Sequence, residues 1–203
     1  MNEERRIAGP VEVRERDGKP VLVGYAAVFD QLSNDLGGFV ERIQRGAFAG
    51  AIKGDVRALW QHDSSYVLGR TTNGTLHLVE DDKGLLVEIM PPDTQWARDA
   101  LTSIQRGDVS QMSFGFNVPK GSDTWKREGK VSVRTLTVVD PLHDVSPVTF
   151  PAYPQTSVDI RAIEEGLRAH PLSEDDDPAD YGMSDEEWRA LFQLKLSIRE
   201  RVI

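Results

Sequence analysis

Short β-type segments separated by turn-forming clusters constrain the fold of this chain more than any other feature. In these segments apolar residues alternate with polar ones, as in strands with one covered face. Clusters of Asp, Gly, Lys and Pro separate two pairs of segments closely enough to predict hairpins. The predicted hairpins join Val11–Arg16 to Val21–Val28 across Asp17–Pro20, and Thr75–Glu80 to Leu85–Met90 across Asp81–Gly84.

Further segments extend this β-rich pattern, and few helices interrupt it. Strands are predicted over 56–62, 109–118, 131–139 and 145–150, and a polar loop over 31–38. A short helix is predicted over 46–53, and a longer one between Asp93 as N-cap and Gly107 as stop signal. The apolar stripe of the longer helix comprises Trp96, Ala97, Ala100, Leu101 and Ile104. The pattern predicts a mainly β, α+β fold, as a barrel or a curled sheet rather than a doubly wound sheet.

The last fifth of the chain has a different character. Residues 161–203 hold eleven Asp or Glu and six Lys or Arg. A helix over 158–170 is followed by an acidic, proline-containing linker over 171–182, and capping-box spacing at Ser184–Glu187 then opens an amphipathic helix with Trp188. We therefore expect one folded domain over 1–160, and a helix, acidic linker and terminal helix over 161–203.

Composition excludes several classes of protein. The chain has no cysteine, which removes disulfides, thiol nucleophiles, Cys-ligated zinc and iron–sulfur clusters. Its net charge of −9 makes nucleic acid and anionic membranes poor partners. The first residues lack the apolar core of a signal peptide, and no apolar run approaches the roughly 20 residues that span a bilayer. We expect a cytosolic location with no membrane partner.

Without cysteine, a covalent nucleophile would mainly be a hydroxyl, a lysine or a carboxylate, and a hydroxyl needs a base such as histidine. The chain has four histidines. His62 ends the predicted strand 56–62, so it is either a catalytic base or a loop residue bonded to Asp63. His77 fits a solvated strand position and His170 is incidental, whereas His143 lies in a turn and stays open.

Ser113 stands out among the serines. In the strand 109–118 it shares a small polar face with Gly115, which leaves space for a substrate backbone. It equally fits an ordinary solvent-facing serine, and Ser110 shares its face only if a bulge intervenes. Asp144 either caps its turn or holds an imidazole.

A metal site is a weaker alternative. His62-Asp63 and His143-Asp144 offer imidazole and carboxylate ligands. However, the sequence has no HExxH helix, no further carboxylate cluster at ligand spacing, no P-loop and no GxGxxG. We expect no cofactor and no metal ion.

Taken in order, several short motifs resemble the prohead serine proteases of tailed bacteriophages, which are related to herpesvirus assemblin. Each motif alone is weak, but the ordered set covers roughly residues 20–160. The motifs are Gly24–Phe29, Arg45–Phe48, Leu59–Asp63, Gly69-Arg70, Met112–Phe116 and Asp144–Ala152.

The resemblance implies an assemblin-like fold, a small closed or partly closed β-barrel edged by a few helices. By position, Ser113 corresponds to the nucleophile, His62 to the general base and Asp144 to the third member. That third position often holds Glu, and assemblin uses a second histidine, so His143 remains an alternative. The donors of the oxyanion hole are not identified.

The resemblance also implies an endopeptidase that acts in the host cytoplasm, inside the assembling procapsid. Its partners would be the major capsid protein with its scaffolding region, and self-association or self-cleavage is expected. Two other functions stay open. The acidic linker and terminal helix suit a non-catalytic assembly or scaffold protein, and the His-Asp pairs suit a metal-dependent hydrolase.

Overall fold

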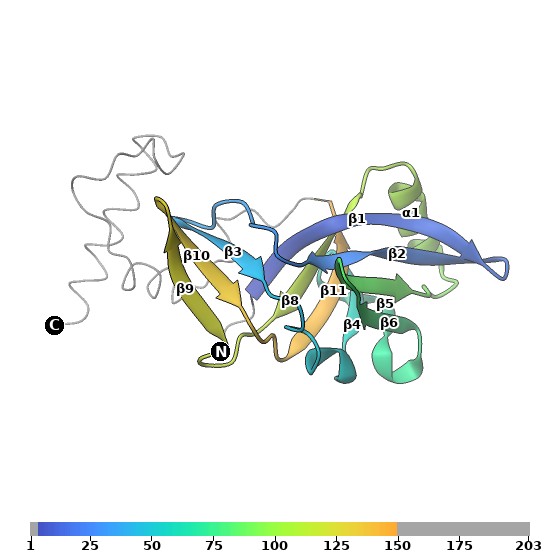
Figure 1. The fold of residues 1–203 in the computed structure, drawn as a ribbon. Coiled ribbons are helices and arrows are strands. Elements are labelled where there is room, and N and C mark those ends of the chain that lie inside the picture. Colours follow the sequence, from blue (N-terminus) through green and yellow to red (C-terminus); the bar gives the residue numbers. More distant parts are fainter. Residues whose placement is uncertain (1–3, 150–203) are drawn as a thin grey trace.

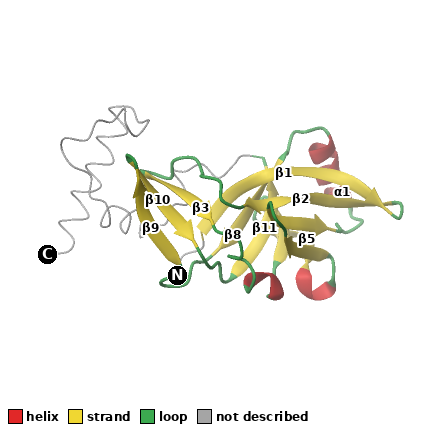
Figure 2. Ribbon diagram, viewed as in Figure 1, coloured by secondary structure: helices red, strands yellow, loops and turns green. Residues whose placement is uncertain are grey.

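The computed structural model describes residues 4–149, and about half of these lie in strands (Figures 1 and 2). Within that range the helices are one α-helix, α1 (Gln95–Gln105), and two 3₁₀ helices, η1 (Ala51–Lys53) and η2 (Thr71–Asn73). The strands are β1 (Glu4–Arg16), β2 (Lys19–Val28), β3 (Phe39–Ile43), β4 (Arg57–Trp60), β5 (Asp63–Arg70), β6 (Leu76–Glu80), β7 (Gly84–Ile89), β8 (Gln111–Phe116), β9 (Asp123–Glu128), β10 (Val131–Leu136) and β11 (Leu142–Val148). The mainly β prediction is confirmed. The domain division at residue 160 and the terminal helix lie outside the described residues.

Eight strands form one curled sheet in the order β5-β4-β11-β8-β1-β2-β7-β6. A register shift between Ile7 and Pro10 bends β1, the strand that links the two halves of this sheet. The edge strands β5 and β6 are joined by η2, and the Thr75 N–H donates to the Arg70 carbonyl at 3.2 Å. No ladder pairs β5 with β6 along their length, so the sheets are not closed into a barrel. Of the closed or partly closed β-barrel that the resemblance implied, the closed form is therefore wrong.

A second, three-stranded sheet stands beside the first, in the order β3-β10-β9 (Figure 1). Strand β10 pairs in parallel with β3 and antiparallel with β9. The sequence predicted β10 but neither of its partners. Strand β9 has the sequence DTWKRE, in which apolar and polar residues do not alternate. Its side chains are largely exposed, so neither face of the strand requires apolar residues.

Both predicted hairpins are confirmed. β1 pairs with β2 around a two-residue turn at Asp17 and Gly18, and β6 pairs with β7. The predicted helix is also confirmed, since Ala97, Ala100, Leu101 and Ile104 are buried. Its N-cap position is Thr94 rather than Asp93, and the short helix over 46–53 shrinks to η1.

Buried charged side chains connect the two sheets. Arg6 on β1 donates to Glu41 on β3 at 2.7 Å, and Arg134 on β10 donates to Glu4 on β1 at 2.8 Å. All four residues are buried, and Arg134 also pairs with Asp123 on β9 at 2.8 Å. Burial alone would lower the pKa of Arg134, but Glu41 and Glu4 outweigh it and raise that pKa, so the guanidinium stays charged.

We expect Glu41→Ala to lower the free energy of unfolding by about 3–5 kcal/mol, because it leaves two buried guanidinium groups short of a partner. Urea unfolding of the full chain measures this. The matched control is Glu12→Ala, which breaks an exposed pair with Arg14 and should cost under about 1 kcal/mol. Equal losses in the two variants would contradict a structural role for the buried cluster.

Candidate active site

The site is built on the central strand β8, which pairs with β1 on one side and β11 on the other. Met112 and Phe114 point into the hydrophobic core, as their alternation predicted. Ser113 faces the opposite way, but it is 0% exposed. The alternative that Ser113 is an ordinary solvent-facing serine is therefore wrong, because both faces of β8 are covered.

Strand β11 brings Asp144 next to this serine. Ser146 lies opposite Ser113 in the β8–β11 ladder, and Asp144 lies opposite Gly115. Because side chains alternate along a strand, Asp144 and Ser146 share the face on which Ser113 lies. Gly115 has no side chain, so it leaves room on that face for the Asp144 carboxylate and for the His62 imidazole.

His62 approaches from the turn between β4 and β5. The predicted strand over 56–62 ends at Trp60, which pairs with Asp63 across a two-residue turn. Gln61 and His62 form that turn with φ of 57° and 59°. The prediction that His62 belongs to the strand is wrong, because the chain reverses its direction at Gln61 and His62. This reversal directs the imidazole toward the sheet.

The three predicted side chains meet at the imidazole. The His62 Nδ1 lies 2.7 Å from Asp144 Oδ2, and the His62 Nε2 lies 2.8 Å from Ser113 Oγ. A carboxylate only accepts hydrogen bonds, so Nδ1 carries the proton and Nε2 is free to accept one from the serine hydroxyl. The side chains of His62 and Asp144 are 7% and 5% exposed, so little water competes for these contacts.

One further hydroxyl completes this group. Ser146 Oγ donates to the same Asp144 oxygen at 2.5 Å, and it is fully buried. The Asp144 carboxylate is thus held by two donors, which fixes its direction toward His62. Sequence reasoning assigned Ser146 no role, although the period-two spacing from Asp144 would have placed both on one face.

The other candidates lie elsewhere. The His143 Nε2 contacts the Asn117 side-chain oxygen, and His77 is exposed on β6. Asp63 is exposed and accepts the Ser65 N–H at 2.8 Å, so the proposed His62–Asp63 bond is replaced by the bond to Asp144. Ser110 is exposed just before β8. His170 lies outside the described residues.

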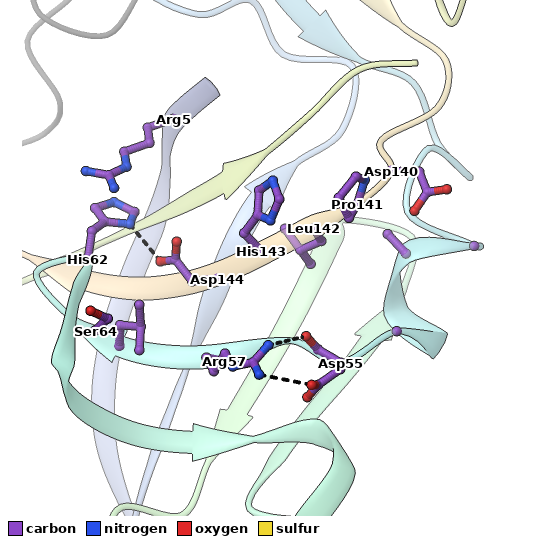
Figure 3. Close-up of a pocket in the computed structure, with 14 residues that line it drawn as sticks. Arg5, Asp55, Arg57, His62, Ser64, Asp140, Pro141, Leu142, His143 and Asp144 are labelled. Atoms are coloured by element: carbon purple, nitrogen blue, oxygen red, sulfur yellow. Dashed lines mark hydrogen bonds and ion pairs between the residues drawn. The ribbon is translucent and has the colours of Figure 1, made fainter. Parts of the chain in front are cut away.

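A cavity of about 460 Å³ adjoins the imidazole (Figure 3). His62 and Asp144 line it together with basic and acidic side chains, including Arg5, Arg57 and Asp55. Arg57 and Arg70 both pair with Asp55, and the hydrogen bond from Arg70 is the main cause that lowers the pKa of Asp55 to about 2.

Among the described residues no group of three His, Asp or Glu side chains is placed to hold a metal ion. Nor does any helix in residues 4–149 have the length and apolar character to cross a membrane.

A serine hydroxyl, an imidazole and a carboxylate joined in this order by hydrogen bonds form the arrangement that is found in serine hydrolases. Comparison with known proteins narrows the class. Residues 9–169 match the family described as caudovirus prohead serine protease, and the chain belongs to that family. The resemblance seen in the sequence is thereby confirmed.

One curated relative is the prohead protease of Enterobacteria phage HK97. It is 29% identical over 153 residues, which are 74% of this chain. The match spans 64% of the length of the HK97 protein. No solved structure matches this chain significantly.

Proposed function

We propose that this chain is a serine endopeptidase of phage head maturation, in which Ser113 is the nucleophile, His62 the general base and Asp144 the third member. The observation that carries the proposal is the bridging position of His62, which bonds to both other side chains. Membership of the prohead protease family supports the same reading.

The geometry suits acyl transfer. His62 Nε2 accepts the Ser113 proton as Oγ attacks the peptide carbonyl carbon, and the C–N bond of the collapsing tetrahedral intermediate then breaks. The imidazolium gives its proton to the leaving amine. Water, deprotonated by His62, then attacks the acyl carbon, and His62 returns that proton to Ser113 Oγ as the ester bond breaks. Asp144 keeps the proton on Nδ1 and stabilises the imidazolium in both halves of the reaction.

The substrates would be the major capsid protein and its scaffolding region, with self-association or cleavage of this chain itself. The site of action would be the procapsid as it assembles in the host cytoplasm. Membership of the prohead protease family supports these assignments, and the curled, mainly β sheet supports an assemblin-like fold.

Labelling with a fluorophosphonate probe tests the proposed function. We expect the full chain to be labelled at Ser113, as located by peptide mass spectrometry, and Ser113→Ala to be unlabelled. The matched control Ser110→Ala, at an exposed serine outside the site, should label normally. Absence of labelling together with EDTA-sensitive hydrolysis would instead favour a metal-dependent hydrolase, and absence of both activities a scaffold protein.

The segment from Pro171 onward is a separate proposal. The acidic, proline-containing linker and the terminal helix that the sequence predicts there would suit a tether that docks on scaffold or capsid protein. We expect deletion of residues 171–203 to leave peptide hydrolysis intact and to reduce incorporation into procapsids, measured by quantitative blotting of purified particles. Loss of hydrolysis in the truncated chain would show that the segment belongs to the catalytic fold.

A further inference from the structure

The turn that carries His62 has an unusual backbone. Gln61 and His62 are consecutive residues with positive φ, at 57° and 59°, in a two-residue hairpin turn. Such turns favour Asn and Gly, because a side chain with a Cβ atom is crowded in the left-handed region. The equivalent turn between β1 and β2 follows this preference at its second position, with Gly18 after Asp17.

Three hydrogen bonds hold Gln61 in this conformation. Its backbone N–H donates to the Pro147 carbonyl at 3.1 Å. Its side-chain Nε2 donates to Thr149 Oγ1 at 2.6 Å, and its Oε1 accepts the Thr149 backbone N–H at 3.1 Å. Because a backbone N–H can only donate, the amide oxygen must face it, which fixes the orientation of the whole side chain.

These bonds join the His62 turn to the strand that holds the carboxylate. Pro147 lies on β11 and Thr149 directly follows it, and β11 also carries Asp144 and Ser146. The backbone next to His62 and the carboxylate that bonds to His62 are therefore both held by β11 and the residue that follows it. A strained turn with such a support is typical of a functional site, where the strain maintains a required geometry.

On the basis of the proposed function, we propose that Gln61 is a positioning residue for the general base. Its side-chain amide, bound to Thr149, keeps the turn in the left-handed conformation that places the His62 imidazole between Asp144 and Ser113. Among the described residues, no hydrogen bond joins Gln61 to either of those two side chains, so Gln61 acts through the backbone of His62.

The decisive comparison is between Gln61→Ala and Gln61→Gly, which both lose the amide contact with Thr149. Glycine adopts the left-handed region without strain and should keep the turn, whereas alanine has no amide to hold it there. The rate of labelling by the fluorophosphonate probe measures the geometry of the site. For Gln61→Ala we expect the maximal labelling rate, kinact, to fall about tenfold to a hundredfold, as for a misplaced catalytic group, with little change in KI, and for Gln61→Gly to stay closer to the wild-type rate.

Two controls separate this role from a general effect on stability. Asp17→Gly relieves positive φ in the exposed turn between β1 and β2, far from the site in sequence, and should leave kinact unchanged. Thr149→Val removes the hydroxyl that accepts from Gln61 and should lower kinact several-fold, whereas Thr149→Ser keeps that hydroxyl and should restore labelling close to the wild-type rate.

A Gln61→Ala variant that labels at the wild-type rate would overturn the positioning role. So would equal losses of kinact in Gln61→Ala and Gln61→Gly, which would show that the conformation of the turn does not set the labelling rate. Ser113→Ala, measured alongside, separates this outcome from failure of the proposed function: persistent labelling without Ser113 would refute the assigned nucleophile, and the role of Gln61 with it.

Discussion

Ser113→Ala and His62→Ala are each expected to lower peptide hydrolysis by about 10⁴-fold or more, because nucleophile and base act as one unit. Ser113 Oγ lies 2.8 Å from His62 Nε2, so removal of either side chain breaks the same proton transfer. The double variant should be little worse than either single variant. Hydrolysis of a fluorogenic peptide library by the full chain measures all three.

The controls are chosen for matched chemistry outside the site. Ser110→Ala and His77→Ala replace an exposed serine and an exposed histidine and should keep wild-type rates. Circular dichroism should show the same β-rich spectrum for all variants. Wild-type hydrolysis by Ser113→Ala would contradict the assignment of the nucleophile, whatever the other variants do.

Asp144→Asn should lower turnover by about 10⁴-fold without abolishing it. The carboxylate accepts from His62 Nδ1 at 2.7 Å, and an amide can instead present an N–H to that nitrogen. Nδ1 would then become the acceptor, and the proton would move to Nε2, where it blocks deprotonation of Ser113. Single-turnover hydrolysis measures the loss.

His143→Ala tests the alternative third member. His143 contacts Asn117 rather than His62, so this change should reduce turnover by less than about tenfold. That loss is much smaller than the loss expected for Asp144→Asn, which removes the carboxylate that fixes the tautomer of His62. A larger loss in His143→Ala than in Asp144→Asn would reassign the third position to His143.

Sequence patterns predicted the elements that depend on local signals. Turn clusters identified both hairpins, and helical periodicity identified α1. Three features escaped because they depend on tertiary context. Strand β9 is held by pairing with β10 and lacks an apolar face of its own. Whether the edge strands β5 and β6 pair and close the sheet depends on the curvature of the whole sheet, which no local pattern encodes. The left-handed turn at Gln61 is stabilised by Thr149, 88 residues away in the chain.

The site shows the same division. Ser113, His62 and Asp144 were identified by their order in family motifs, and the fold then brings them together from β8, a turn and β11. The two supporting residues, Ser146 and Gln61, lie within the same motifs. Gln61 bonds to Thr149 in a distant chain segment, and Ser146 bonds to Asp144 on the same face of one strand. Only the folded structure shows these contacts.

Co-expression with the major capsid protein tests the central claim most directly. The wild-type chain should convert the capsid precursor to a shorter product, detected by gel electrophoresis and by mass spectrometry of the new N-terminus. Ser113→Ala should be made in equal amount and leave the precursor intact. Equal processing by both chains, or by neither, would contradict a Ser113-dependent prohead protease.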